Sequence, residues 1–291
     1  MKFVAQDPDS HWLINNSRPN TANAPDLISA LLGWETMRSW NIGFDLGMLN
    51  NRLTVSFDWF NRKTINMVGP APELPVTLGA NVPKMNNADM QSTGFELDLG
   101  WRDRIKDFDY SVHLLLSDDR QKILKYPNTT GKINTWYVGK YNGDIWGFET
   151  IGIAKSQEEM DAHLASLPNG GQDALGVKWG AGDIMYRDLN GDGKISDGAT
   201  LNDPGDKKVI GNTSPRFRFG LDLNASWKGI DVRLFFQGVA KRDAWLNDNM
   251  FWGATGGIWQ SACFTSHLDF FREEGDDFWS ANKDAYFPRI L

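Results

Sequence analysis

The residues best suited to chemistry form a short acidic and amide run in the middle of the chain. Asp188, Asn190 and Asp192 stand at alternate positions, and Gly193 and Lys194 follow directly. Ca²⁺ takes about six to eight hard oxygen ligands, and this spacing lets alternate side chains wrap one ion. The glycine permits the sharp turn, and the Lys194 carbonyl supplies a further oxygen. The sequence therefore predicts a calcium-type loop in which the three side chains converge on one ion.

The predicted loop lacks the closing ligand of an EF-hand. Ala199 stands where an EF-hand carries its bidentate glutamate, and no pair of helices is predicted around the loop. The closing carboxylate must therefore come from Asp197, Asp203 or Asp206. Every predicted ligand is a protein group, so the ion would be structural. The alternative is an Asx-rich turn that binds no ion.

Nucleophilic and acid–base motifs are not evident. The four histidines carry no HExxH spacing, and the sequence has no GxSxG or CxxC. The single cysteine, Cys263, excludes an internal disulfide framework and a thiolate cluster. Carboxylates are plentiful but no pair is marked out, so nothing indicates an enzyme, and a hydrolase is the weakest of the functions considered.

Aromatic side chains are the other group with binding chemistry. Six tryptophans lie in predicted loops or in the tail, where they could stack on sugar rings or anchor loops and a protein interface. They are Trp136, Trp146, Trp179, Trp245, Trp252 and Trp259.

Composition alone describes a soluble chain. The 291 residues carry a net charge of −7, which argues against a nucleic-acid partner. No apolar run approaches the ~20 residues of a membrane helix, and the first residues lack the apolar stretch of a secretory signal. The elements that must position the loop and the tryptophans change this interpretation.

The dominant periodicity is two, which predicts β-strands. It predicts three hairpins at about 40–60, 94–117 and 216–238, each with one apolar and one polar face. The hairpin turns are short, with the second spanning 102–107. The connections at about 61–93, 118–215 and 239–291 are long. A capping box at Ser156 and Glu159 predicts a short helix, ending near Leu167, within the longest connection.

Short turns on one side and long loops on the other are typical of a transmembrane β-barrel. We therefore predict an all-β fold, part of a large antiparallel barrel with short periplasmic turns and long extracellular loops. Trp59, Trp101 and Trp227 are predicted to form an interfacial girdle beside the short turns. Acidic side chains on the opposite face suit a water-filled lumen: Asp45, Asp58, Glu96, Asp98, Asp109, Asp222 and Asp231, joined by Arg233.

The competing hypothesis is a secreted, calcium-stabilised carbohydrate-binding β-sandwich, because a soluble sheet also alternates. The environment of the face bearing Phe217, Phe219, Leu221 and Leu223 separates the two. A second packed sheet over that face would favour the sandwich, and a single open sheet would favour the barrel. The barrel also requires residues 118–216 and 239–291 to lie at one end of the sheet, opposite the short turns.

Several segments resemble the SusC/RagA family of TonB-linked outer-membrane proteins. The most diagnostic are the calcium-type loop in 182–195 and the V-I-G-N run that leads from 209 into the strand at 217. Further matching segments, in order, are Trp34–Asp45, Gly94–Leu97, Phe235–Gly238 and Ala285–Arg289.

The resemblance implies a role in import across the outer membrane of Bacteroidetes. Members form a large plugged barrel under a SusD-like surface lipoprotein and admit glycans or oligopeptides when TonB pulls on the plug. The implied partners are therefore a SusD-like lipoprotein, TonB, a glycan or peptide and outer-membrane lipid. The sequence has no recognisable signal peptide, TonB box or plug domain, and six strands fall short of the family's ~22. We expect a C-terminal-side piece of such a transporter, reaching TonB only through an N-terminal region that this sequence lacks.

Overall fold

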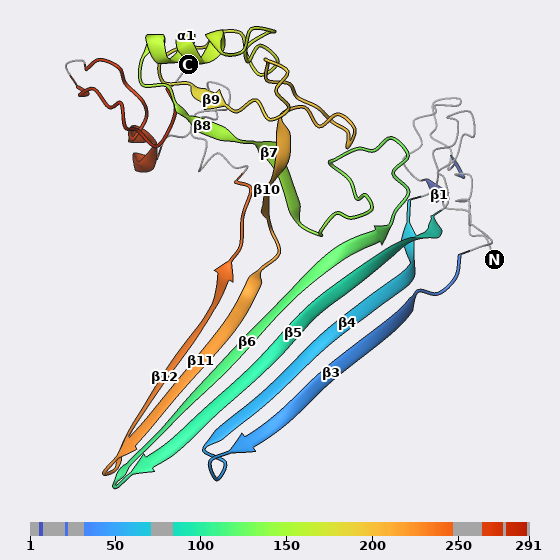
Figure 1. Cartoon of the computed structure of the whole chain (residues 1–291), viewed down its shortest axis with the longest axis vertical. Coiled ribbons are helices and arrows are strands. Elements are labelled where there is room, and N and C mark those ends of the chain that lie inside the picture. Colours follow the sequence, from blue (N-terminus) through green and yellow to red (C-terminus); the bar gives the residue numbers. More distant parts are fainter. Residues whose placement is uncertain are drawn as a thin grey trace.

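The computed structural model describes residues 6–7, 21–22, 32–70, 84–246, 264–275 and 278–289. In these ranges, no helix has both the length and the apolar character needed to cross a membrane. The main element is one long, tilted sheet with a cluster of loops and short strands beyond one of its ends (Figure 1).

Six antiparallel strands form this sheet. Their spatial order is β12-β11-β6-β5-β4-β3. Strands of this sheet that follow one another along the chain are therefore also neighbours in space. The three predicted hairpins are confirmed as β3–β4, β5–β6 and β11–β12. The strands are β3 (Thr36–Met48), β4 (Leu53–Gly69), β5 (Met85–Ile105), β6 (Phe108–Lys125), β11 (Arg216–Trp227) and β12 (Ile230–Lys241).

The turns that join the hairpins are tight. Lys228 and Gly229 both have positive φ, at 46° and 86°, which matches the twist of the flanking strands. The second hairpin was predicted to turn over 102–107, and this was wrong: only Lys106 and Asp107 form the turn. The strands continue up to the pair Ile105 and Phe108, and Arg104 lies opposite Asp109 with 3.7 Å between Nε and Oδ1.

At the other end the strands are longer than predicted. β4 runs to Gly69, β5 starts at Met85, β6 ends at Lys125 and β12 ends at Lys241, so the strands take up parts of the predicted loops 61–93, 118–215 and 239–291. The added segments mix polar residues with apolar ones such as the buried Ala88 and Ile123. Asn86 donates through Nδ2 to the carbonyl oxygen of Asn66 at 2.6 Å.

One face of the sheet is apolar across all six strands. Cross-strand register aligns Leu46, Val55, Leu99, Leu114, Leu221 and Phe236 in one row. Among the described residues no second sheet covers this face, because the three other sheets have two strands each and are separate. The β-sandwich hypothesis is therefore wrong, and the observed sheet is the open wall that the barrel hypothesis requires.

The predicted girdle beside the short turns is right for two of its three tryptophans. Trp227 ends β11 at the turn, and Trp101 lies near the end of β5, where it donates through Nε1 to the Tyr110 hydroxyl at 3.3 Å. Trp59 was misplaced: it pairs with Ile42 and Phe95, well into β4. From Leu53 to Trp59 the strand rises about 20 Å, so Trp59 marks the opposite border of the apolar band.

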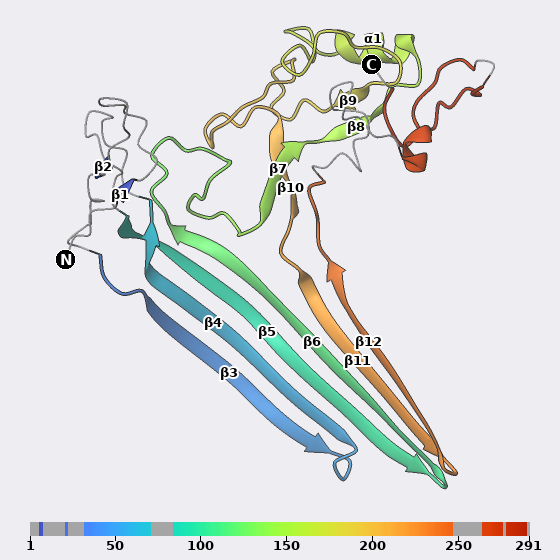
Figure 2. The same ribbon diagram turned by 180° about the vertical axis from the view of Figure 1, so that it is seen from behind.

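The loops that follow β6 and β12 lie together at the end opposite the short turns (Figures 1 and 2). This confirms the predicted topology. They contain β7 (Asp144–Phe148) paired with β10 (Lys207–Asn212), β8 (Thr150–Ile153) paired with β9 (Ile184–Tyr186), and the 3₁₀ turn η2 (Thr265–Leu268). A further small sheet pairs β1 (Gln6–Asp7) with β2 (Thr21–Ala22).

The predicted helix is α1 (Gln157–Ala165), slightly shorter than expected. Ser156 caps it by accepting the Glu159 backbone N–H at 3.3 Å. Met160 is fully buried and packs with Ala154 and Met185. The loop region therefore has a small core of its own, whereas the sheet leaves most of its apolar side chains partly exposed.

Candidate functional site

Asp188 anchors the predicted calcium-type loop through backbone groups. Its Oδ1 accepts the Gly191 N–H at 2.6 Å and its Oδ2 accepts the Gly193 N–H at 2.8 Å. Both glycines have positive φ, at 75° and 78°, so the loop needs them to turn around the carboxylate. Burial raises the pKa of Asp188, but these N–H groups outweigh it and hold the pKa below its ordinary value.

Asp206 is the predicted closing residue that contacts the loop. Its carboxylate is fully buried and accepts the backbone N–H groups of Leu189 at 2.8 Å and Ser196 at 2.7 Å. Asp197 instead forms an ion pair with Lys207, and Asp203 accepts the Gly205 N–H at 3.3 Å. Of the three carboxylates that could close the loop, Asp206 alone lies against both of its arms.

The remaining loop side chains bond to their neighbours. Asn190 Oδ1 accepts the Asp192 N–H at 2.9 Å, and Asn190 Nδ2 lies 3.3 Å from Asp192 Oδ2. Asp192 Oδ1 accepts the Lys194 N–H at 3.1 Å. In the described part of the chain, no three His, Cys, Asp or Glu side chains are arranged to hold a metal. Convergence of Asp188, Asn190 and Asp192 on one ion therefore stays a prediction.

The loop tryptophans divide into structural and accessible ones. Trp179 packs against the Met160 core, and Trp146 on β7 donates through Nε1 to the Tyr137 hydroxyl at 3.2 Å. Trp136 meets Tyr126 edge-on at 5.5 Å between ring centroids and lines a hollow of about 510 Å³. Trp245 is 59% exposed. Trp252 and Trp259 lie outside the described residues.

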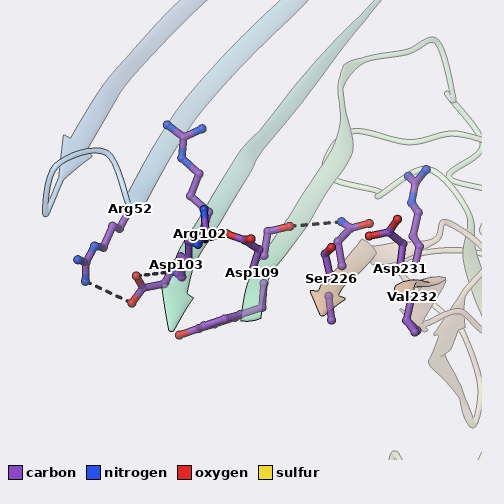
Figure 3. Close-up of a pocket in the computed structure, with 13 residues that line it drawn as sticks. Arg52, Arg102, Asp103, Asp109, Ser226, Asp231 and Val232 are labelled. Atoms are coloured by element: carbon purple, nitrogen blue, oxygen red, sulfur yellow. Dashed lines mark hydrogen bonds and ion pairs between the residues drawn. The ribbon is translucent and has the colours of Figure 1, made fainter. Parts of the chain in front are cut away.

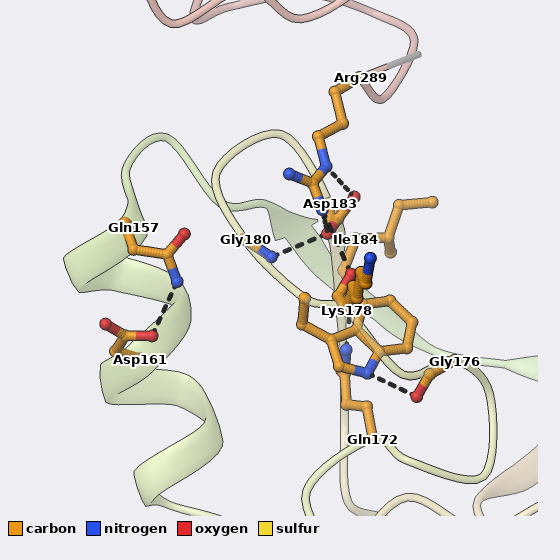
Figure 4. A network of polar contacts seen from close by, with 10 residues as sticks. Gln157, Asp161, Gln172, Gly176, Lys178, Gly180, Asp183, Ile184 and Arg289 are labelled. Carbon is orange, nitrogen blue, oxygen red and sulfur yellow. Dashed lines mark hydrogen bonds and ion pairs between the residues drawn. The ribbon is translucent and has the colours of Figure 1, made fainter. Parts of the chain in front are cut away.

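An ion pair that joins the two long loops was not predicted. Arg289 donates to Asp183 through Nε at 2.8 Å and Nη2 at 2.6 Å, and Asp183 also accepts the Gly180 N–H (Figure 4). Asp183 is only 7% exposed, so this bidentate contact is well shielded. Both residues lie in segments that marked the family resemblance, but their separation of 106 positions gave no signal of contact.

The polar face of the sheet carries charged pairs along its length. His113 Nε2 lies 2.5 Å from Asp98 Oδ1, Arg233 binds Asp222 with both Nε and Nη2, and Arg218 contacts Asp119 at 2.7 Å. Near the short turns, charged side chains from several strands line a hollow of about 750 Å³ (Figure 3). Such a face can remain in contact with water or with a polar partner while its reverse contacts lipid.

The fold and its two faces are those of a barrel wall, and comparison with known proteins agrees. Residues 8–258 match the family described as TonB dependent receptor-like, beta-barrel. The chain therefore belongs to this family.

Curated TonB-dependent receptors are similar to this chain. TonB-dependent receptor SusC of Bacteroides thetaiotaomicron is 25% identical over 238 residues, covering 78% of this chain and 21% of SusC. TonB-dependent receptor P3 of Formosa agariphila is 25% identical over 248 residues, covering 80% of this chain and 23% of that protein.

Solved structures show the same fold. The RagAB peptide transporter aligns with a TM-score of 0.64 at 20% identity, covering 100% of this chain and 29% of the matched chain. The resemblance to SusC and RagA is confirmed by these matches, and the chain spans 20–23% of the length of the curated relatives that it matches.

Proposed function

We propose that this chain forms part of the wall and the extracellular loops of a TonB-dependent importer in a bacterial outer membrane. The single observation that carries the proposal is the open sheet itself: one face is apolar across six aligned strands, and the other carries ion pairs. The apolar face suits contact with lipid, and the ion-paired face suits contact with an aqueous lumen. The loops gathered at one end supply the surface that faces the cell exterior.

Energy and partners would come from outside this chain. TonB would act through a plug in the complete transporter, and a SusD-like lipoprotein would cover the loops. The work of the wall is to bind, orient and release a substrate during passage, with no bond broken. The family match and the SusC and RagAB relatives support this assignment.

The substrate is a glycan or an oligopeptide. The accessible Trp136 and Trp245, which can stack on sugar rings, favour a glycan. The solved structure with the same fold is named the RagAB peptide transporter, which indicates a peptide substrate for that protein.

The test is growth of a strain lacking the complete gene on glycans and on oligopeptides as sole carbon sources. Loss of growth on one class, restored by the intact gene, identifies the substrate class. Normal growth and normal uptake of both labelled classes would contradict an import function.

We also propose a structural Ca²⁺ in the loop from Asp188 to Lys194. Hard oxygens at alternate positions and the buried Asp206 behind the loop suit this ion. It would fix the base of β10, which pairs with β7 in the loop region.

A further inference from the structure

The apolar face of β3–β6 changes character toward its loop end. Cross-strand register places successive rows of side chains above one another on this face. The row Phe44, Phe57, Leu97 and Leu116 is wholly apolar, and the next consists of Ile42, Trp59, Phe95 and Asp118. Above these lies the row Trp40, Asn61, Thr93 and Arg120, and above it the row Arg38, Lys63, Gln91 and Lys122.

The uppermost of these rows is a line of exposed cations. Arg38 and Lys63 are direct partners on adjacent strands, and Gln91 lies between Lys63 and Lys122 in the register. Lys122 Nζ also lies 5.7 Å from the centroid of the Tyr141 ring. Adjacent strands lie about 4.8 Å apart, so the two facing cations repel each other unless an anion lies between them. We call Arg38, Lys63 and Lys122 the cationic row.

The carboxylates of the described residues do not neutralise this row. Among the described residues, none of its members forms an ion pair with Asp or Glu. Two carboxylates on the same strands are engaged elsewhere: Asp118 binds Arg216 with both oxygens, and Asp89 accepts the Asn66 N–H at 2.9 Å. The row therefore presents net positive charge on the side of the sheet that faces lipid.

A hollow of about 480 Å³ lies directly below the facing cations. Trp40, Ile42 and Trp59 line it, and Arg38 and Lys63 complete it on the loop side. One row to the next on the same face is about 6.6 Å along a strand. Apolar side chains thus lie below positive charge on this face, which is the order in which a lipid of the outer leaflet presents its acyl chains and its charged headgroup.

We propose that the cationic row binds a phosphate of a lipid in the outer leaflet of the membrane, with its acyl chains against Trp40, Ile42 and Trp59. The outer leaflet of a bacterial outer membrane consists of lipopolysaccharide, whose lipid A anchor carries phosphate and several acyl chains. Arginine grips phosphate through two parallel N–H donors, and lysine adds a compact charge beside it. The site rests on the membrane orientation proposed above and not on the transported substrate.

The test measures lipid A retained by the complete transporter polypeptide after purification in detergent. Phosphorylated and dephosphorylated lipid A are compared, with inorganic phosphate alone as a third probe. The variants are R38Q, K63Q, K122Q and the triple substitution. The matched control is R62Q, because Arg62 adjoins Lys63 on the same strand but lies on the opposite face, over the Phe60 ring.

Each single substitution in the row is expected to weaken retention of phosphorylated lipid A about fivefold, and the triple substitution about a hundredfold. Two controls provide the baselines. R62Q should retain phosphorylated lipid A as well as the parent protein does. Dephosphorylated lipid A should be retained equally by the parent protein and by every variant. Equal loss in R62Q and K63Q, indifference to the lipid phosphate, or equal binding of inorganic phosphate would overturn the proposal. The proposal would also be overturned if the substitutions abolished self-association of the transporter and left its retention of lipid A unchanged. Heat-dependent gel mobility confirms that each variant is folded, and substrate uptake, measured separately, reports on the import function.

Discussion

Two consecutive leucines on β6 provide a matched test of which face meets lipid. Leu114 pairs with Leu99 and Leu221 on the apolar face. Leu115 pairs with Asp98 and Gly220 on the polar face and is 45% exposed. The substitutions Leu114→Arg and Leu115→Arg therefore introduce the same side chain at the same height on opposite sides of one strand.

The expected costs differ because only one arginine enters hydrocarbon. Leu114 lies between the row of Trp101 and the row of Trp59, near the middle of the apolar band. An arginine facing lipid at this depth costs about 2–4 kcal/mol, which lowers the ratio of folded to unfolded protein about 30- to 900-fold. An arginine at position 115 faces water beside Asp98, so its cost is ~0.5 kcal/mol or less.

The assay is denaturant unfolding of the complete polypeptide in lipid vesicles, followed by tryptophan fluorescence. L114R is expected to lower the free energy of unfolding by the stated amount and L115R to leave it nearly unchanged. Equal costs for the two substitutions, or a larger cost for L115R, would refute the assignment of the lipid-facing side.

Three further outcomes follow from the loop region. R289Q removes the half-shielded bidentate ion pair with Asp183, so it should lower the free energy of unfolding by ~2 kcal/mol. It should also speed amide exchange at Phe271, whose N–H bonds to the Phe287 carbonyl. The control K155Q breaks an exposed pair with Asp284 and should leave that exchange unchanged. D188N should weaken Ca²⁺ binding by at least about tenfold in calorimetric titration, while D203N should not, and equal heats for both variants and the parent chain would contradict the calcium loop. The hydrogen bond from Lys208 holds the pKa of Glu149 below its ordinary value of 4.5, so its support of β7–β10 is present above that pH and is lost as the pH falls through the lowered pKa. Protection of the β10 amides relative to unfolded amides that stays constant across that range, or that changes identically in E149Q, would contradict it.

Alternation of apolar and polar residues was enough to predict the sheet. It placed the three hairpins, while the lengths of the connections predicted the common end of the long loops and the capping box predicted the helix after Ser156. It failed near Gly69 and Met85, where shifts in the pairing register interrupt the alternation, and before the Lys106 turn, where the strands continue through charged residues.

The loop contacts depend on tertiary structure that spacing does not encode. Three aspartates were predicted as possible closing residues of the loop around Asp188, and the spacing did not show that one of them, Asp206, is buried against Leu189 and Ser196. Arg289 and Asp183 likewise meet only because the last described segment returns to β9. Trp59 was misplaced although the start of its strand at Leu53 was predicted correctly: it lies six residues from the short turn, on the far side of the apolar band.

The most direct measurement of the central claim is the topology of single cysteines in intact cells. In a background with Cys263 replaced by serine, Val177→Cys places a thiol on the long loops, where Val177 is 88% exposed, and Lys228→Cys places one in a short turn. A membrane-impermeant maleimide should label V177C in whole cells and K228C only after the outer membrane is opened. Labelling of K228C but not V177C in whole cells, or of both equally, would contradict a sheet that spans the outer membrane with its long loops outside.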